Sequence, residues 1–127
     1  DWFADYLLES NLLELDAHVG IIAEGFGRTH SQALHLSEII AWLGRKLVVV
    51  NLEVSEEEVV RRMLERAKTE DRPDSNATEK IQERLTKFTD ETGPALAYFR
   101  EQGIVIDING KLSPEEVAKE IAAKLDI

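Results

Sequence analysis

The chain has 127 residues, of which 43% are hydrophobic and 31% charged, a composition typical of one soluble globular domain. The formal net charge of −10 argues against binding a nucleic-acid polymer, which requires a basic surface, but not against a small anionic ligand. There is no cysteine, and no leader or membrane-spanning run is visible. We therefore expect a cytoplasmic protein without disulfides, cysteine metal sites or a membrane partner.

Apolar periodicity predicts strands that alternate with helices along the chain. Short apolar runs predict strands at residues 19–23, 47–54 and 104–108. Helical spacing and capping signals predict helices over 2–15, over 32–43 with a stop at Gly44, from Ser55 with Glu58 as capping partner, from Asn76 with Glu79 to an interruption at Gly93-Pro94, and from Ser113-Pro114 to about Leu125. This order predicts one α/β domain over residues 1–127, with a parallel sheet and helices on both faces.

Residues 21–32 form an apolar run that ends in an acid, a glycine hinge, an arginine and a polar helix start. In open α/β sheets, ligands bind just outside such strand ends, and a guanidinium there suits phosphate oxygens. The competing interpretation is an ordinary turn in which Arg28 is solvated or pairs with Glu24. A ligand site at this turn is thus a hypothesis that needs further residues.

Further arginines follow in one stretch at positions 61, 62, 66 and 72, with Arg84 soon after. Arg62 and Arg66 are four residues apart and therefore share one helix face. Together with Arg28, Arg72 and Arg84, they are expected to converge on one anionic pocket suited to phosphoryl transfer. The alternative is that arginine and glutamate simply alternate on solvated helices.

A phosphate-binding glycine loop is expected to be absent from this chain. Gly20 and Gly25 have the spacing of such a loop, but Phe26 and Gly27 stand where it requires a lysine and a hydroxyl residue. The three histidines also lack the spacing of a metal site.

The ordered set of these residues resembles the C-terminal two thirds of an adenylate kinase of the short-lid form. The residues that carry the resemblance are Glu24-Gly25-Phe26-Gly27-Arg28-Thr29, Gln32, Val54-Ser55-Glu56-Glu57 with Arg62 and Arg66, Asp71-Arg72-Pro73-Asp74-Ser75-Asn76, Arg84-Leu85 and Ile108-Asn109-Gly110. The resemblance implies a P-loop kinase-like core with a short lid at about 68–76. It also implies that the family's first strand and P-loop lie in a segment preceding this chain, so we expect a fragment that is inactive or nearly so alone.

The resemblance further implies the reaction of ATP with AMP to give two ADP, assisted by Mg²⁺, in a protein that is monomeric once the preceding segment is present. The implied catalytic residues are Arg28, Arg66, Arg72 and Arg84. The implied AMP-binding residues are Gly25, Arg28, Gln32 and Arg84, and Thr29 and Gln32 favour adenine. The implied ATP-binding residues are Arg62, Arg66, Arg72 and Gly110, and Glu24 would order Mg²⁺ through water.

Three positions depart from the family pattern. Glu24 and Gly27 stand where the family has aspartate and proline, and Ser75 replaces a lid aspartate. These departures support a second hypothesis, a non-catalytic adenylate-kinase-like module that binds a nucleotide or a protein partner. A third is an α/β domain with surface arginines and no ligand.

Overall fold

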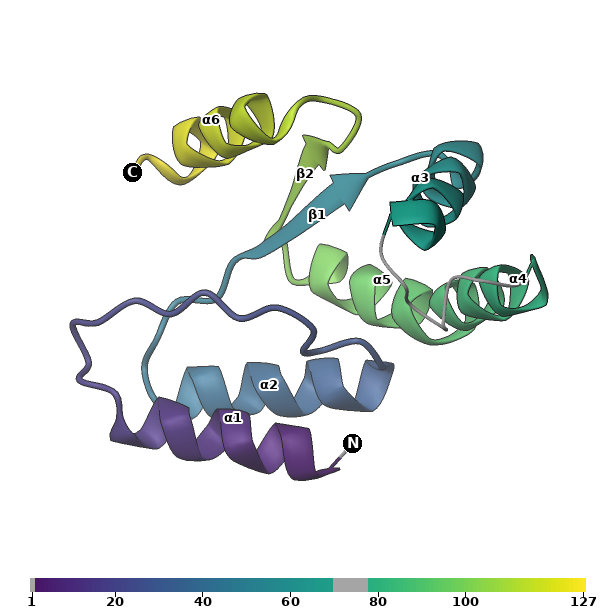
Figure 1. Cartoon of the computed structure of the whole chain (residues 1–127). Coiled ribbons are helices and arrows are strands. Elements are labelled where there is room, and N and C mark those ends of the chain that lie inside the picture. Colours follow the sequence, from purple (N-terminus) through teal and green to yellow (C-terminus); the bar gives the residue numbers. More distant parts are fainter. Residues whose placement is uncertain (1, 70–77) are drawn as a thin grey trace. The chain divides into compact units, whose positions relative to one another are not determined.

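The computed structural model describes residues 2–69 and 78–127, and these form six α-helices, one π-helix and two β-strands (Figure 1). The elements in chain order are α1 (Trp2–Glu14), α2 (His30–Trp42), β1 (Val49–Glu53), α3 (Glu56–Thr69), α4 (Thr78–Lys87), the π-helix η2 (Phe88–Thr92), α5 (Gly93–Glu101), β2 (Val105–Asn109) and α6 (Pro114–Leu125). The predicted α/β class with a parallel sheet is confirmed. Within the described ranges, every helix is too short or too polar to cross a membrane.

The chain divides into two compact units. The first unit comprises Asp1–Val48 and Glu91–Ile104, and it contains α1, α2 and α5. The second unit comprises Val49–Asp90 and Val105–Ile127, and it contains both strands with α3, α4 and α6. The single domain expected over the whole chain stays a prediction.

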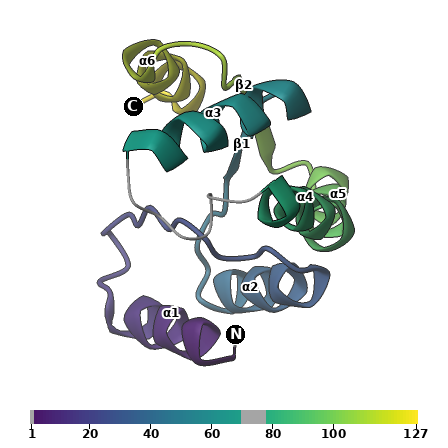
Figure 2. The ribbon, with the colours of Figure 1, turned by 45° about the vertical axis from the view of Figure 1, so that its right-hand side comes forward.

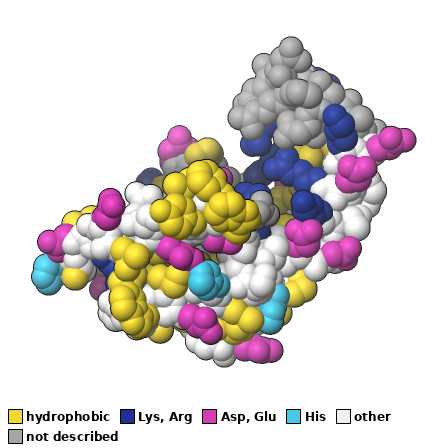
Figure 3. Space-filling view, turned by 90° about the horizontal axis from the view of Figure 1, so that it is seen from below, with side chains coloured by type: hydrophobic (Ala, Val, Ile, Leu, Met, Phe, Trp, Pro, Cys, Tyr) yellow, Lys and Arg dark blue, Asp and Glu magenta, His cyan; other side chains and the backbone are white. Residues whose placement is uncertain are grey.

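In the first unit, α2 packs against α5 and lies beside α1 (Figures 1 and 2). The buried apolar side chains of this unit are Leu12, Ala33, Ile40, Ala95 and Phe99. By contrast, the outer face of α1 leaves Trp2 78% and Leu13 60% exposed, and hydrophobic side chains gather on the face shown in Figure 3. Helix α1 is therefore apolar on more than the side that it buries.

The strand predicted at residues 19–23 is wrong. This segment is irregular, and Ile22 is 99% exposed. A strand needs a neighbour to bond its backbone groups, and no strand of the described residues pairs with this one. Instead, the guanidinium of Arg45 donates to the backbone oxygens of Leu15, Asp16 and Val19, each at 2.9 Å. One side chain therefore holds the segment that follows α1.

In the second unit, β1 and β2 form a parallel pair in which Val49 lies opposite Val105 and Glu53 opposite Asn109. Both strands were predicted, with ends one or two residues away from the observed ones. Ile108 is fully buried, and α6 packs against β2. The β-branched and apolar residues thus pair as expected for a parallel sheet.

The predicted interruption before α5 takes the form of η2, which follows α4 directly. Pro94, in the first turn of α5, has no N–H to donate to the carbonyl four residues earlier. A local π-helical turn accommodates such a missing bond. At the last helix, the predicted cap is confirmed, because Ser113 and Glu116 form a capping box.

A polar pair crosses the sheet at its centre. Asn51 lies opposite Asp107 in the register, and its Nδ2 donates to Asp107 Oδ1 at 2.8 Å in a partly buried setting. Removal of one partner of such a bond leaves a desolvated polar group behind. The pair therefore holds this register more firmly than apolar contact alone.

We predict that Asn51→Ala lowers the free energy of unfolding by about 1–2 kcal/mol, because the Asp107 carboxylate loses a donor. Asn51→Asp should cost more at neutral pH than Asn51→Ala, because two carboxylates then face each other, and the difference should shrink in acid. Urea unfolding of the wild type and the two variants, at neutral and at acidic pH, measures these changes. Equal stability of the three proteins at neutral pH would contradict the assigned role of the pair.

Candidate functional site

The candidate phosphate-binding arginine lies at the end of an irregular turn just before α2. Arg28 is exposed, and its guanidinium folds back over Gly25, where a Cβ atom would lie 3.3 Å from Nη2. Two residues predicted at the AMP site are therefore brought together in the first unit. No described side chain forms an ion pair with Arg28, so the pairing with Glu24 that sequence alone left open is not seen in this part of the chain.

Gln32 connects this turn to two helices. Its Oε1 accepts from the backbone N–H of Arg28 at 3.1 Å and of Thr29 at 3.3 Å. Its Nε2 donates to Asp5 Oδ1 on α1 at 3.2 Å. Thr29 caps α2 in a capping box with Gln32, so the helix begins before the predicted start at Gln32 itself. The side chain predicted to bind adenine is thus also the one that orders the turn.

Asp5 was missed by sequence analysis, since it lies 27 residues from Gln32 and no local spacing signals the contact. A second contact of the same kind joins Glu9 Oε1 on α1 to His35 Nε2 on α2. These four side chains help to line a pocket between the two helices, with apolar walls that include Leu12. The wall of this pocket therefore includes Gln32 and the acid that holds it.

The backbone conformation and packing of Gly27 explain why the chain has glycine where the family has proline. Gly27 is buried with φ of 68°, and a Cβ atom there would lie 3.3 Å from the ring of Phe99 and 3.6 Å from Leu36. Proline fixes φ near about −65°, so it cannot adopt this conformation. The turn before Arg28 is therefore packed against α5 through its glycine.

Glu24 is exposed at the start of the same turn. Among the described residues, no group of three or more His, Asp or Glu side chains is arranged to hold a metal ion. A single carboxylate still fits Mg²⁺, because this ion commonly keeps several waters and binds one or two carboxylates together with substrate phosphates. The donor set of this turn is thus compatible with the predicted contact through water.

In the second unit, Glu58 of α3 binds two arginines. Its Oε1 accepts from Arg61 Nη2 at 2.6 Å and from Arg62 Nε at 2.7 Å, and its Oε2 accepts from Arg61 Nε at 2.8 Å. These bonds, first to Arg61 and then to Arg62, lower the pKa of Glu58 to about 2. Sequence analysis expected Glu58 to cap the helix at Ser55, but its carboxylate is used by the arginines instead.

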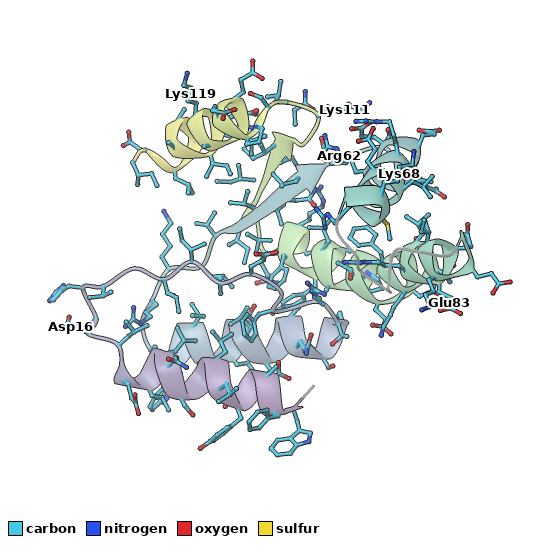
Figure 4. All side chains as sticks on the ribbon, viewed as in Figure 1. Asp16, Arg62, Lys68, Glu83, Lys111 and Lys119 are labelled. Carbon is cyan, nitrogen blue, oxygen red and sulfur yellow. The ribbon has the colours of Figure 1, made fainter. Side chains whose placement is uncertain are left out.

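Arg62 contacts another residue of the predicted ATP site. Its Nη2 donates to the backbone oxygen of Gly110 at 2.8 Å, in the turn between β2 and α6. Figure 4 shows Arg62 on the side of α3 nearest the turn that carries Lys111. Gly110 itself is buried, and a Cβ atom there would lie 2.4 Å from Val54 Cγ2. Only glycine fits between this turn and the end of β1.

The remaining predicted arginines are placed only in part. Arg66 on α3 and Arg84 on α4 are exposed residues of the second unit, and each makes a contact of its own. Arg72 and residues 70–76 of the expected lid lie outside the described residues, while Lys68 and Thr69 belong to α3. The convergence of these arginines with Arg28 on one pocket stays a prediction.

We predict that Gly110→Ala destabilises the chain by about 1–3 kcal/mol, because the added methyl group overlaps Val54 and forces the turn to move. Gly20→Ala is the matched control, since nothing lies within 4 Å of a Cβ atom at Gly20. Chemical denaturation of both variants provides the comparison. If Gly110→Ala were as stable as Gly20→Ala, the close approach at Gly110 would be disproved.

We also predict a pH effect from Glu58. Because its folded pKa of about 2 is below the ordinary value of 4.5, its ionised form favours the folded state. This contribution is complete above about pH 4.5 and is lost as the pH falls toward about 2. In Glu58→Gln, thermal stability should depend less steeply on pH over that interval, most clearly at low salt. Identical pH profiles for the two proteins would contradict this.

Comparison with known proteins identifies the family. A family model described as an AAA domain matches residues 5–82. A protein named adenylate kinase from Thermobifida fusca (strain YX) is 38% identical over 120 residues, which cover 94% of this chain and 63% of that protein. Another, from Azobacteroides pseudotrichonymphae genomovar. CFP2, is 39% identical over 127 residues, covering 96% and 66%.

A third protein named adenylate kinase, from Leptospira biflexa serovar Patoc (strain Patoc 1 / Ames), is 41% identical over 116 residues, covering 91% of this chain and 62% of that protein. The chain thus spans a little under two thirds of the length of these curated relatives. The family match covers more than half of the chain. The chain therefore belongs to the AAA domain family, and the resemblance to adenylate kinases that its sequence motifs carry is confirmed.

Proposed function

We propose that the protein carrying this chain is an adenylate kinase, which transfers a phosphoryl group from ATP to AMP and yields two ADP. The observation that carries the proposal is the match of more than 90% of the chain to proteins of that name. The geometry within each unit supports it, because predicted site residues lie beside each other there. Arg62 donates to the backbone oxygen of Gly110, and the guanidinium of Arg28 lies over Gly25.

On the AMP side, Arg28 is the proposed phosphate clamp. Its guanidinium is exposed, and its backbone N–H is fixed by Gln32. A planar fork of donors on an ordered backbone suits the oxygens of a phosphate. Gln32 would bind the adenine, and Arg84 would be a second partner of the AMP phosphate. Gln32 Nε2 already donates to both carboxylate oxygens of Asp5, at 3.2 and 3.5 Å, and these bonds orient the amide.

On the ATP side, Arg62 and Gly110 are the proposed contacts of the donor nucleotide. Arg66 and Arg72 would balance the charge of the transferring group, as positioning and charge stabilisation supply most of the catalysis of phosphoryl transfer. Glu24 would hold Mg²⁺ through water, together with the phosphates of ATP. When bound, this ion neutralises charge that develops on the phosphate oxygens.

A non-catalytic module that binds a nucleotide or a protein partner is the second candidate function. The residue changes at Glu24 and at Ser75 favour it, because both alter acids of the family motif. Such a module would bind AMP without forming ADP. Measurement of turnover therefore distinguishes the two functions. Measurement of nucleotide binding distinguishes both from a chain without any ligand site.

We predict that Arg28→Ala weakens AMP binding about 10- to 100-fold, because a charge-assisted pair is lost. The affinity for adenosine, which lacks the phosphate, should hardly change. Isothermal titration of the chain with AMP and with adenosine measures both effects. Lys46→Ala is the matched control, because it removes one exposed cation from the same unit outside the proposed site.

Turnover is tested by ADP formation from ATP and AMP, by the chain and by the chain joined to the part of the Leptospira biflexa protein that it does not match. Arg28→Ala should lower kcat/KM of the joined protein by at least about 100-fold. AMP binding without turnover in the joined protein would favour the non-catalytic module. Equal AMP affinity of Arg28→Ala and Lys46→Ala would show that Arg28 is not part of the AMP site.

A further inference from the structure

We infer that Glu58 is a positioning residue for the donor nucleotide, because it holds the guanidinium of Arg62 against the carbonyl of Gly110. The inference rests on the proposed function, which places Arg62 and Gly110 at ATP. Sequence analysis gave Glu58 only a capping role. The contacts of its carboxylate assign it a different one.

The guanidinium of Arg62 is held at two of its nitrogen atoms. Nε donates to Glu58 Oε1 at 2.7 Å, and Nη2 donates to the Gly110 oxygen at 2.8 Å. Since the group is planar, two bonds at different nitrogen atoms fix the orientation of its plane. The Arg62 side chain is still 43% exposed, so surface remains for a flat ligand. Guanidinium planes stack on aromatic rings, and a nucleobase is one.

Glu58 is in turn held by Arg61. Two nitrogen atoms of Arg61 bind the two oxygens of Glu58, while Arg61 Nη1 donates to Glu65 at 2.7 Å. Bidentate pairs of this kind are directional as well as strong. Arg61 therefore fixes the carboxylate, and the carboxylate fixes Arg62. The Glu58 side chain is only 20% exposed, less than either arginine.

An ordinary helix-surface ion pair is the competing explanation. Pairs four residues apart on an exposed helix contribute little to stability and leave the cation free to move. Here the far end of Arg62 bonds a backbone oxygen 48 residues away, in a turn where only glycine fits. The pair thus links α3 to the turn after β2 rather than only decorating the helix.

The test compares Glu58→Ala and Glu58→Gln with wild type in the full chain. Alanine keeps the helix but removes the acceptor, while glutamine keeps a neutral acceptor of the same shape. Glu57→Ala is the matched control, since Glu57 is a neighbouring exposed acid of the same helix. Two readouts are used: exchange of the Arg62 Nε–H with water by ¹⁵N NMR, and ATP affinity by isothermal titration.

We expect the Arg62 Nε–H to exchange about tenfold faster in Glu58→Ala, with Glu58→Gln intermediate and Glu57→Ala unchanged. ATP affinity should fall about three- to tenfold in Glu58→Ala, and the same change in an Arg62→Ala background should have no further effect. Unchanged far-UV circular dichroism would show that the helix is intact.

Two results would overturn the inference. One is an Arg62 Nε–H that exchanges equally fast in wild type and Glu58→Ala. The other is a loss of ATP affinity that persists in the Arg62→Ala background or appears equally in Glu57→Ala. If the chain alone does not bind ATP, its affinity is measured in the joined protein described above, and no binding there would contradict the proposed donor site. The exchange measurement still decides whether Glu58 positions Arg62.

Discussion

Two side chains that are proposed to contact nucleotides, Gln32 and Arg62, are each held by a carboxylate. Each of the two also orders the backbone near it. Asp5 bonds the amide of Gln32, whose oxygen accepts from the N–H groups of Arg28 and Thr29. Glu58 bonds Arg62, whose far end reaches Gly110. In both units a polar side chain fixes an irregular turn at the end of a helix or strand. Acidic side chains of the chain therefore orient Gln32 and Arg62.

The parts of the fold that sequence analysis predicted correctly are those with local causes. The cap at Ser113 and the interruption at Pro94 depend on residues within one helical turn, and the structure confirms both. The prediction of a strand at 19–23 was wrong because a strand requires a partner strand, and apolar content alone does not provide one. The start of α2 was placed too late because the box formed by Thr29 and Gln32 was not used.

The contacts of the candidate site also divide into those between distant positions and those within one or two helical turns. The contact of Asp5 with Gln32 joins positions far apart in the sequence, so no spacing rule finds it. The pairing of Glu58 with Arg61 and Arg62 has visible helical spacing, three and four residues, but the same acid also fits a capping box three residues after Ser55. Two favourable local patterns competed for one carboxylate, and the charged partners determined the result.

The candidate arginines of the two units, Arg28 and Arg62, differ in whether a carboxylate pairs with them. Arg62 is already paired with a carboxylate, so its charge is largely balanced and its orientation is what it offers a ligand. Arg28 has no carboxylate partner among the described residues, so it can give its full charge to an anion. A net negative protein can thus attract a phosphate locally, because nearby charge outweighs the screened average. Under the proposed function, this difference favours phosphate binding by Arg28 and orientation of the base by Arg62.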